Sequence, residues 1–182
     1  MVVKFLWGLS FALVVSSCTG KGSGTIQLAD GTSLKLERSE TLRVNITSEP
    51  PTLDWNKATD TTSSHIINNI MEGLVGYDIE DRELRLVPLL ATEWVASEKA
   101  RVWTFKIRPG IKWTDGAEFH AQQVVDSWRR LLAKETASEY AYFLFAIKNA
   151  RAFNEGKVPW GQVGVSLAQP ASGPSEIKVE LE

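Results

Sequence analysis

Residues 102–132, VWTFKIRPGIKWTDGAEFHAQQVVDSWRRLL, contain the clearest structural signals in this sequence. At the start of this stretch, Trp103, Phe105 and Ile107 alternate with polar residues. A period of two residues is typical of a strand with one buried face, so we expect a strand here. The next pair, Pro109-Gly110, predicts a type II turn, because proline fixes φ at the first central position and glycine accepts the positive φ of the second.

The second half of the stretch changes from strand to helix. Residues 111–113 are predicted to form a short returning strand, and Asp115-Gly116 the next turn. His120 occupies the expected N-cap of a helix, with Gln123 placed to complete a capping box. Apolar residues then recur with helical spacing and predict one buried face, made of Val124, Val125, Trp128, Leu131 and Leu132. The stretch therefore predicts the order strand, turn, strand, turn, helix.

The same patterns predict the flanking elements. These are a hairpin within residues 25–36, strands at residues 42–46 and 177–181, a helix beginning at Ser63 or Ser64, and a helix at residues 140–153. The first of these helices places Ile66, Ile70 and Leu74 on one face, and Gly73 and Gly76 mark its end.

The N-terminal residues resemble an export signal. Lys4 precedes an apolar run of eleven residues, 5–15, which is too short to span a bilayer of about 30 Å as a helix. The next segment, Val15-Ser16-Ser17-Cys18, resembles a bacterial lipobox, whose cysteine becomes the lipidated N-terminus. We expect a lipoprotein signal peptide at residues 1–17, then lipidated Cys18 and a flexible tether over residues 18–24. The alternative is an ordinary signal peptide with an incidental buried cysteine.

The composition argues against several classes of function. The net charge of −2 provides no basic stripe for nucleic acid, and a single cysteine permits no internal disulfide. The sequence has no nucleophile elbow, zinc-protease motif or Walker loop. His65 and His120 are 55 residues apart without acidic neighbours at ligand spacing, and the acidic residues within 78–83 fit a solvated loop. We therefore expect no enzyme activity, no metal site and no cofactor.

The motifs of the opening stretch resemble a known family. The pattern R-x-G-x-x-W-x-D-G, followed by A-x-x-V-x-x-S-W-x-R, is similar to the oligopeptide-binding, family 5 extracellular solute-binding proteins. The matching residues are Arg108, Gly110, Trp113, Asp115, Gly116, Ala121, Val124, Ser127, Trp128 and Arg130. Further segments of similarity are residues 42–54, 71–74, 136–140 and 177–181. The resemblance covers about residues 40–182 in one order.

This resemblance implies an α/β fold of the periplasmic-binding-protein type II-like class, with two lobes and a ligand cleft between them. Because the chain is much shorter than that family, residues 41–182 are expected to be the N-terminal part of the first lobe, a mixed β-sheet with flanking helices. Residues 25–40 are expected to be a hairpin extension. The final residue, Glu182, directly follows a strand pattern, which favours a truncated form of a longer protein.

The resemblance also implies where this lobe contacts a ligand. Thr59, Asp60, Thr61 and Thr62 align with a segment whose backbone runs beside the ligand as an added strand, and Tyr140 aligns with a ligand-contacting tyrosine. The alternatives are a capping loop ahead of a helix and a buried aromatic residue. Among the tryptophans, packing in the core is expected for Trp103, Trp113 and Trp128.

The function implied is that of a substrate-binding lipoprotein of an ABC importer, which binds peptides or a related small solute and delivers them to the membrane permease. Its place would be the periplasmic side of the cell envelope, anchored to the membrane through Cys18. An alternative from another class is an envelope lipoprotein that senses peptides or acts as a scaffold without a transporter. Neither interpretation involves nucleic acid.

Overall fold

The computed structural model describes residues 24–27, 31–36, 42, 44–168 and 174–182. The expected signal peptide at residues 1–17, Cys18 and the tether up to residue 23 lie outside the described residues. The chain forms two compact units, Met1–Asn45 and Ile46–Glu182. Among the described residues, no helix combines the length and the apolar character needed to cross a membrane.

The described part of the first unit is a pair of short strands. Strand β1 (Gly24–Gln27) pairs antiparallel with β2 (Ser33–Leu36), and the Gln27 side-chain amide donates to the Ser33 hydroxyl at 2.8 Å. The two strands lie where the sequence predicts a hairpin, although its turn residues 28–30 are outside the described residues. The strand predicted at residues 42–46 is wrong for its described residues, because none of them is assigned to a strand and Leu42 and Val44 are exposed.

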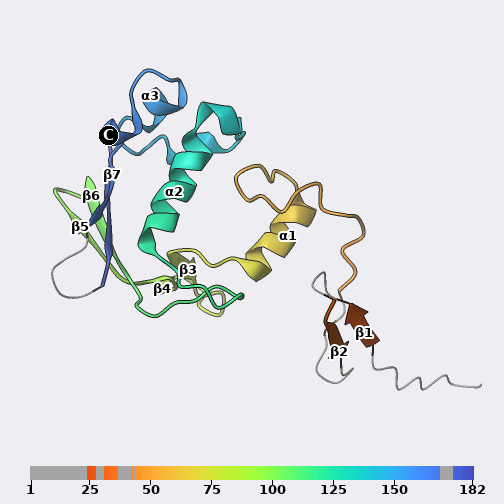
Figure 1. The fold of residues 1–182 in the computed structure, drawn as a ribbon. Helices are drawn as coiled ribbons and strands as arrows, with labels where there is room; N and C mark the ends of the chain where they lie inside the picture. The colour runs from red at the N-terminus through yellow and green to blue at the C-terminus, as the bar shows by residue number, and fades with distance from the viewer. Residues whose placement is uncertain (1–23, 28–30, 37–41, 43, 169–173) are drawn as a thin grey trace, which may run out of the picture. The chain divides into compact units, whose positions relative to one another are not determined.

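A four-stranded antiparallel sheet forms the centre of the second unit (Figure 1). Its order is β5 (Ala91–Ser97), β6 (Val102–Ile107), β8 (Glu176–Glu180) and β7 (Val165–Ala168). The strand patterns predicted at residues 102–107 and 177–181 are thus confirmed as β6 and β8, which are hydrogen-bonded to each other in the middle of the sheet.

The turns after β6 follow the glycine signals, but the predicted strand between them is wrong. Gly110 and Gly116 have positive φ, at 71° and 88°, as their turn positions require. Residues 111–113 contribute only one isolated bridge, between Lys112 and Glu118, and the Gly116 N–H donates to the Trp113 carbonyl at 2.9 Å. The segment is therefore a tight loop, and β6 pairs instead with β5, the strand just before it, and with β8 from the end of the sequence.

Helix α2 (Ala121–Leu132) packs on this sheet and carries the apolar face that the sequence predicts. Buried residues from the helix and the strands form one core, which includes Val125, Leu132 and Ile177. His120 is the N-cap as predicted, and its N–H donates to the Gln123 side-chain oxygen at 2.9 Å. The 3₁₀ turn η1 (Lys134–Thr136) follows the helix.

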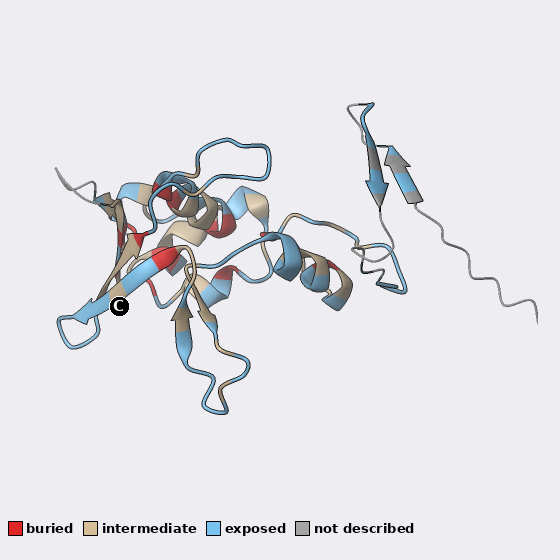
Figure 2. Ribbon diagram, turned by 90° about the horizontal axis from the view of Figure 1, so that it is seen from below, coloured by how far each residue is buried: buried red, intermediate tan, exposed pale blue. Residues whose placement is uncertain are grey.

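Helix α1 (Thr61–Ile70) starts earlier than predicted. Its N-cap is Asp60, not Ser63 or Ser64, and the helix ends before Gly73, with Met71 as its C-cap. Most of its residues are exposed or half-buried (Figure 2). A small hairpin of β3 (Val75–Tyr77) and β4 (Leu86–Pro88) follows.

The helix predicted at residues 140–153 is interrupted. The structure instead has a 3₁₀ turn, η2 (Ala141–Leu144), and a short helix, α3 (Ala150–Asn154). Asn149 adopts a left-handed conformation with φ of 59°, which an α-helix cannot contain. Ile147 forms an isolated antiparallel bridge with Leu181, the residue that directly follows β8. A further 3₁₀ turn, η3 (Trp160–Gln162), precedes β7.

Candidate functional site

The structure brings together the two predicted ligand-contact segments. The Tyr140 hydroxyl donates a hydrogen bond to the Thr59 backbone carbonyl at 3.3 Å, across 81 residues of sequence. Thr59 is exposed, and Asp60 has extended backbone angles of φ −107° and ψ 159°. Tyr140 is not the buried aromatic residue of the alternative interpretation, because 38% of it is exposed. The two segments therefore form one surface.

The backbone carbonyl of Thr59 has a hydrogen-bond partner, and its backbone N–H has none among the described residues. Its carbonyl accepts from Tyr140, whereas none of the described residues accepts a hydrogen bond from its N–H. An exposed residue with a free N–H, next to an extended residue, can donate to the carbonyl of an extended chain placed beside it. This geometry suits recognition of a polypeptide main chain.

The rest of the predicted segment has a structural role. The Asp60 carboxylate accepts from the Ser63 N–H at 2.9 Å and caps α1, as the capping-loop alternative predicts. The Ser63 hydroxyl and N–H beside it hold the pKa of Asp60 below its ordinary value. Thr61 and Thr62 form the first turn of the helix, where the Thr62 and Ser48 hydroxyls are 3.3 Å apart. Of these residues, Thr59 is therefore the strongest candidate for a main-chain contact.

An exposed group of aromatic rings lies beside this surface. Tyr140, Tyr142 and Phe143, here called the aromatic patch, are 38%, 54% and 67% exposed. The Tyr142 and Phe143 ring centroids are 4.5 Å apart, and the Tyr140 centroid is 5.5 Å from that of Phe143. The resemblance to the family identified Tyr140 alone, and the sequence analysis assigned no role to Tyr142 and Phe143.

Two long-range contacts fasten the loop before α1 to helix α2. The Arg130 guanidinium donates to both carboxylate oxygens of Asp54, at 2.7 and 2.5 Å, and the Trp55 indole N–H donates to the Ser127 hydroxyl at 3.0 Å. The hydrogen bonds from Arg130 hold the pKa of Asp54 below its ordinary value. These contacts fix the position of the loop that leads to Thr59. The sequence analysis did not predict these pairings, although Asp54, Ser127 and Arg130 lie in the segments quoted for the resemblance.

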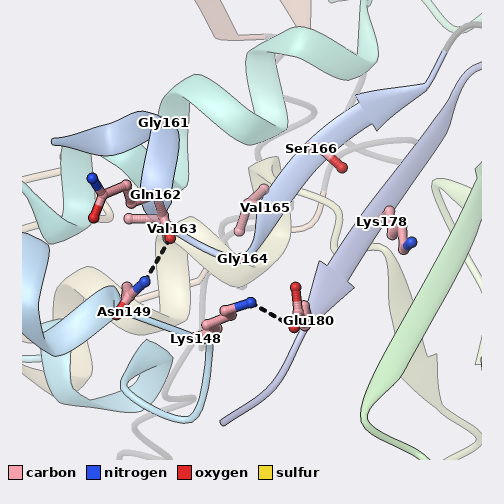
Figure 3. Close-up of a pocket in the computed structure, with 10 residues that line it drawn as sticks. All are labelled: Lys148, Asn149, Gly161, Gln162, Val163, Gly164, Val165, Ser166, Lys178 and Glu180. Carbon is pink, nitrogen blue, oxygen red and sulfur yellow. Dashed lines mark hydrogen bonds and ion pairs between the residues drawn. The ribbon is translucent and has the colours of Figure 1, made fainter. Parts of the chain in front are cut away.

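A polar cavity of about 490 Å³ lies near the ends of β7 and β8 (Figure 3). Two contacts join polar groups of its lining: Lys148 forms an ion pair with Glu180 at 2.8 Å, and the Asn149 side chain donates to the Gln162 carbonyl at 2.9 Å. None of the predicted ligand-contact residues lines this cavity. These contacts tie the chain around residue 148 to β8.

A second cavity, also of about 490 Å³, is mainly apolar and lies between α1 and α2. Its lining includes Trp55, Met71, Trp113 and Trp128. The prediction of a core position is confirmed for Trp103 and Trp128, which pack against the core, but it is wrong for Trp113. Trp113 is 38% exposed, packs on Phe119 and donates to Gln123 at 3.1 Å, because its tight loop holds it at the surface.

Among the described residues, no group of three or more His, Cys, Asp or Glu side chains is arranged to hold a metal ion.

The model of the family "Bacterial extracellular solute-binding proteins, family 5 Middle" matches residues 85–175, which is half of the sequence. The chain belongs to this family. Family 5 is a family of solute-binding proteins, which fits the lack of catalytic motifs.

Named relatives of this family 5 chain include the periplasmic murein peptide-binding protein MppA of Escherichia coli, 36% identical over 94% of this chain. The oligopeptide-binding protein OppA of Bacillus subtilis is 34% identical over 95% of it. The chain spans 30% of the length of each of these two relatives.

Solved structures agree with this family 5 assignment. The substrate-binding domain of an oligopeptide ABC transporter from Bacillus anthracis superposes with a TM-score of 0.65 and 40% identity, over 74% of this chain and 24% of that structure. The unliganded open form of MppA gives a TM-score of 0.64 at 36% identity, over 74% of this chain and 25% of that structure. The α/β fold of these binding proteins, of which the chain represents a part, is thus confirmed.

Proposed function

We propose that this chain is part of the substrate-binding subunit of an ABC importer and that its ligand is a peptide. The names of its relatives, which are peptide-binding and oligopeptide-binding proteins, support this assignment. The observation that carries it is the contact between Tyr140 and Thr59: Thr59 is exposed, it precedes the extended Asp60, and none of the described residues accepts a hydrogen bond from its N–H. The protein is a receptor and not an enzyme.

Recognition through the main chain explains how one protein can bind peptides of different sequence. Every peptide residue except proline offers one N–H and one C=O, so a strand laid beside Thr59 gains hydrogen bonds that do not depend on its side chains. Tyr140 contributes by fixing the Thr59 carbonyl. The N–H of Thr59, from which none of the described residues accepts, can pair with a carbonyl of the peptide.

The affinity of this surface alone is expected to be weak. A protein that binds its ligand at about 1 µM gains about 8 kcal/mol, and a surface that provides half of this free energy binds at about 1 mM. Binding assays on this chain therefore need peptide at millimolar concentration and a method that detects weak complexes.

A peptide titration with two tyrosine variants tests the proposal. We expect tri-alanine to bind at about millimolar concentration in an NMR titration, and Tyr140→Phe to weaken binding about threefold to tenfold, since it removes one hydrogen bond. The matched control is Tyr77→Phe, which changes a tyrosine that is 66% exposed on β3 and outside the site. Equal affinities for both variants, or no binding of tri-alanine to the unmodified protein, would contradict the proposal.

We further propose that the protein is a lipoprotein on the periplasmic side of the cell envelope, where it hands peptides to a membrane permease. The domain plan is a signal peptide at residues 1–17, lipidated Cys18 with a tether to residue 24, a hairpin extension at residues 25–40 and the first-lobe segment at residues 41–182. The lipobox-like sequence ending at Cys18 supports the anchor. Cys18→Ser should abolish labelling with radioactive palmitate and release the protein from the membrane fraction; unchanged labelling would refute the anchor.

A further inference from the structure

We propose that the aromatic patch of Tyr140, Tyr142 and Phe143 selects peptides that place an aromatic side chain next to the main-chain contact at Thr59. This inference rests on the proposed peptide binding and adds a preference among peptides. It assigns a binding role to Tyr142 and Phe143.

The local backbone explains why these rings face outward. In the 3₁₀ turn η2, Ala141 is 4% exposed and Leu144 packs against the hydrophobic core. A 3₁₀ helix has three residues per turn, so positions 141 and 144 share one face, and Tyr142 and Phe143 occupy the other two. The inward face anchors the turn and holds the two rings at the surface.

The three rings of the patch pack against one another in tilted and edge-on arrangements. The Tyr142 and Phe143 planes meet at 32°, whereas Tyr140 meets Tyr142 edge-on at 79° with centroids 6.2 Å apart. A further aromatic ring can add to such a cluster through offset or edge-to-face contacts, which favour it over an aliphatic group of similar size. None of the three patch residues is charged, so the patch itself offers no electrostatic attraction to an anionic surface such as a membrane.

The position of Tyr140 connects the patch to the peptide. Its hydroxyl contacts the Thr59 carbonyl while its ring contacts Phe143, so one residue belongs to both the main-chain contact and the patch. In an extended peptide, alternate side chains point to opposite sides at a rise of about 3.3 Å per residue. A peptide strand beside Thr59 can therefore place one side chain over the rings. Because Tyr140 belongs to both the main-chain contact and the aromatic patch, we expect a side chain of the bound peptide to cover the patch.

The test compares peptides that differ in one side chain. The probes are tri-alanine, the three tripeptides with a single phenylalanine in an alanine background, and the same three with cyclohexylalanine. By NMR titration of the purified protein, we expect one phenylalanine peptide to bind about tenfold more tightly than tri-alanine and more tightly than its cyclohexylalanine counterpart. Equal binding of the phenylalanine and cyclohexylalanine peptides, or of the phenylalanine peptides and tri-alanine, would overturn the inference and leave peptide binding intact.

Substitutions then locate the preference. The double variants Y142A/F143A and Y142L/F143L should reduce the ratio of phenylalanine-peptide to tri-alanine affinity to about one, and the leucine pair keeps apolar side chains in case truncation unfolds the protein. Tyr77→Ala, at an exposed tyrosine elsewhere, should leave the ratio at its original value. A ratio that persists in the leucine variant refutes the role of the patch. No binding of any tripeptide to the unmodified protein would refute both this inference and the proposed function.

Discussion

Replacing Gly164 by alanine should destabilise the protein, because its surroundings leave no room for a methyl group. An added Cβ would lie 2.5 Å from the Glu180 carbonyl oxygen and 2.9 Å from the Lys148 Cβ. Three backbone hydrogen bonds meet at this point: Lys148 N–H to the Glu180 carbonyl at 2.9 Å, Gly164 N–H to the Lys148 carbonyl at 2.9 Å, and Glu180 N–H to the Gly164 carbonyl at 2.7 Å. The clash is thus with backbone that cannot move freely.

The size of the effect follows from these contacts. Inserting a methyl group into a packed site costs about 1–3 kcal/mol, and weakening one of the backbone hydrogen bonds adds about 1 kcal/mol. We therefore expect Gly164→Ala to lower the free energy of unfolding by about 3 kcal/mol. For a chain of this length, that corresponds to a fall in melting temperature of about 6–12 °C.

Gly161 provides a matched control within the same polar cavity (Figure 3). A Cβ at Gly161 would have no other atom within 4 Å, so Gly161→Ala should change the free energy of unfolding by less than about 0.5 kcal/mol. Urea titration followed by tryptophan fluorescence, together with thermal unfolding by circular dichroism, measures both variants. Equal unfolding midpoints for the two variants would show that the close packing at Gly164 is not as described.

Three further substitutions test how the loop before α1 is held. Asp54→Asn should lower the urea midpoint at pH 7; because Arg130 holds the pKa of folded Asp54 below its ordinary value of 3.8, the stabilisation is present above that pH and is lost as the pH falls through the folded pKa. The difference between Asp54→Asn and the unmodified protein should therefore shrink below pH 3.8, and a difference independent of pH would contradict this. Trp55→Phe removes the donor to Ser127 and should cost about 1 kcal/mol in urea unfolding, with no additional loss from Ser127→Ala in the same chain. Additive losses in that double-mutant cycle would refute the contact.

The parts of the fold that depend on nearby residues could be predicted from the sequence. Strand β6, helix α2 with its cap at His120, and the turn at Pro109-Gly110 each follow from period or from the φ that a residue permits. The strand expected at residues 111–113 failed because β6 pairs with the preceding strand, residues 91–97, and with residues 176–180 near the end of the sequence; a period of two residues predicts a strand but does not specify its partners.

The remaining errors and omissions also have long-range causes. The helix expected at residues 140–153 fails at Asn149, whose left-handed conformation comes with a bridge between Ile147 and Leu181. Asp54 and Arg130 are 76 residues apart, so their ion pair is visible only in the folded chain. For the candidate site, resemblance to a family supplied Thr59 and Tyr140, and the structure supplied their contact and the neighbouring rings.

The most direct test of the central proposal is the amide NMR signal of Thr59 during a titration with tri-alanine. If a peptide main chain accepts a hydrogen bond from this group, the Thr59 amide proton should move downfield and saturate at about millimolar peptide, together with signals of Tyr140. If the Thr59 signal stays in place while signals around the cavity at Lys148 and Glu180 move, the peptide binds elsewhere and the proposed site is wrong.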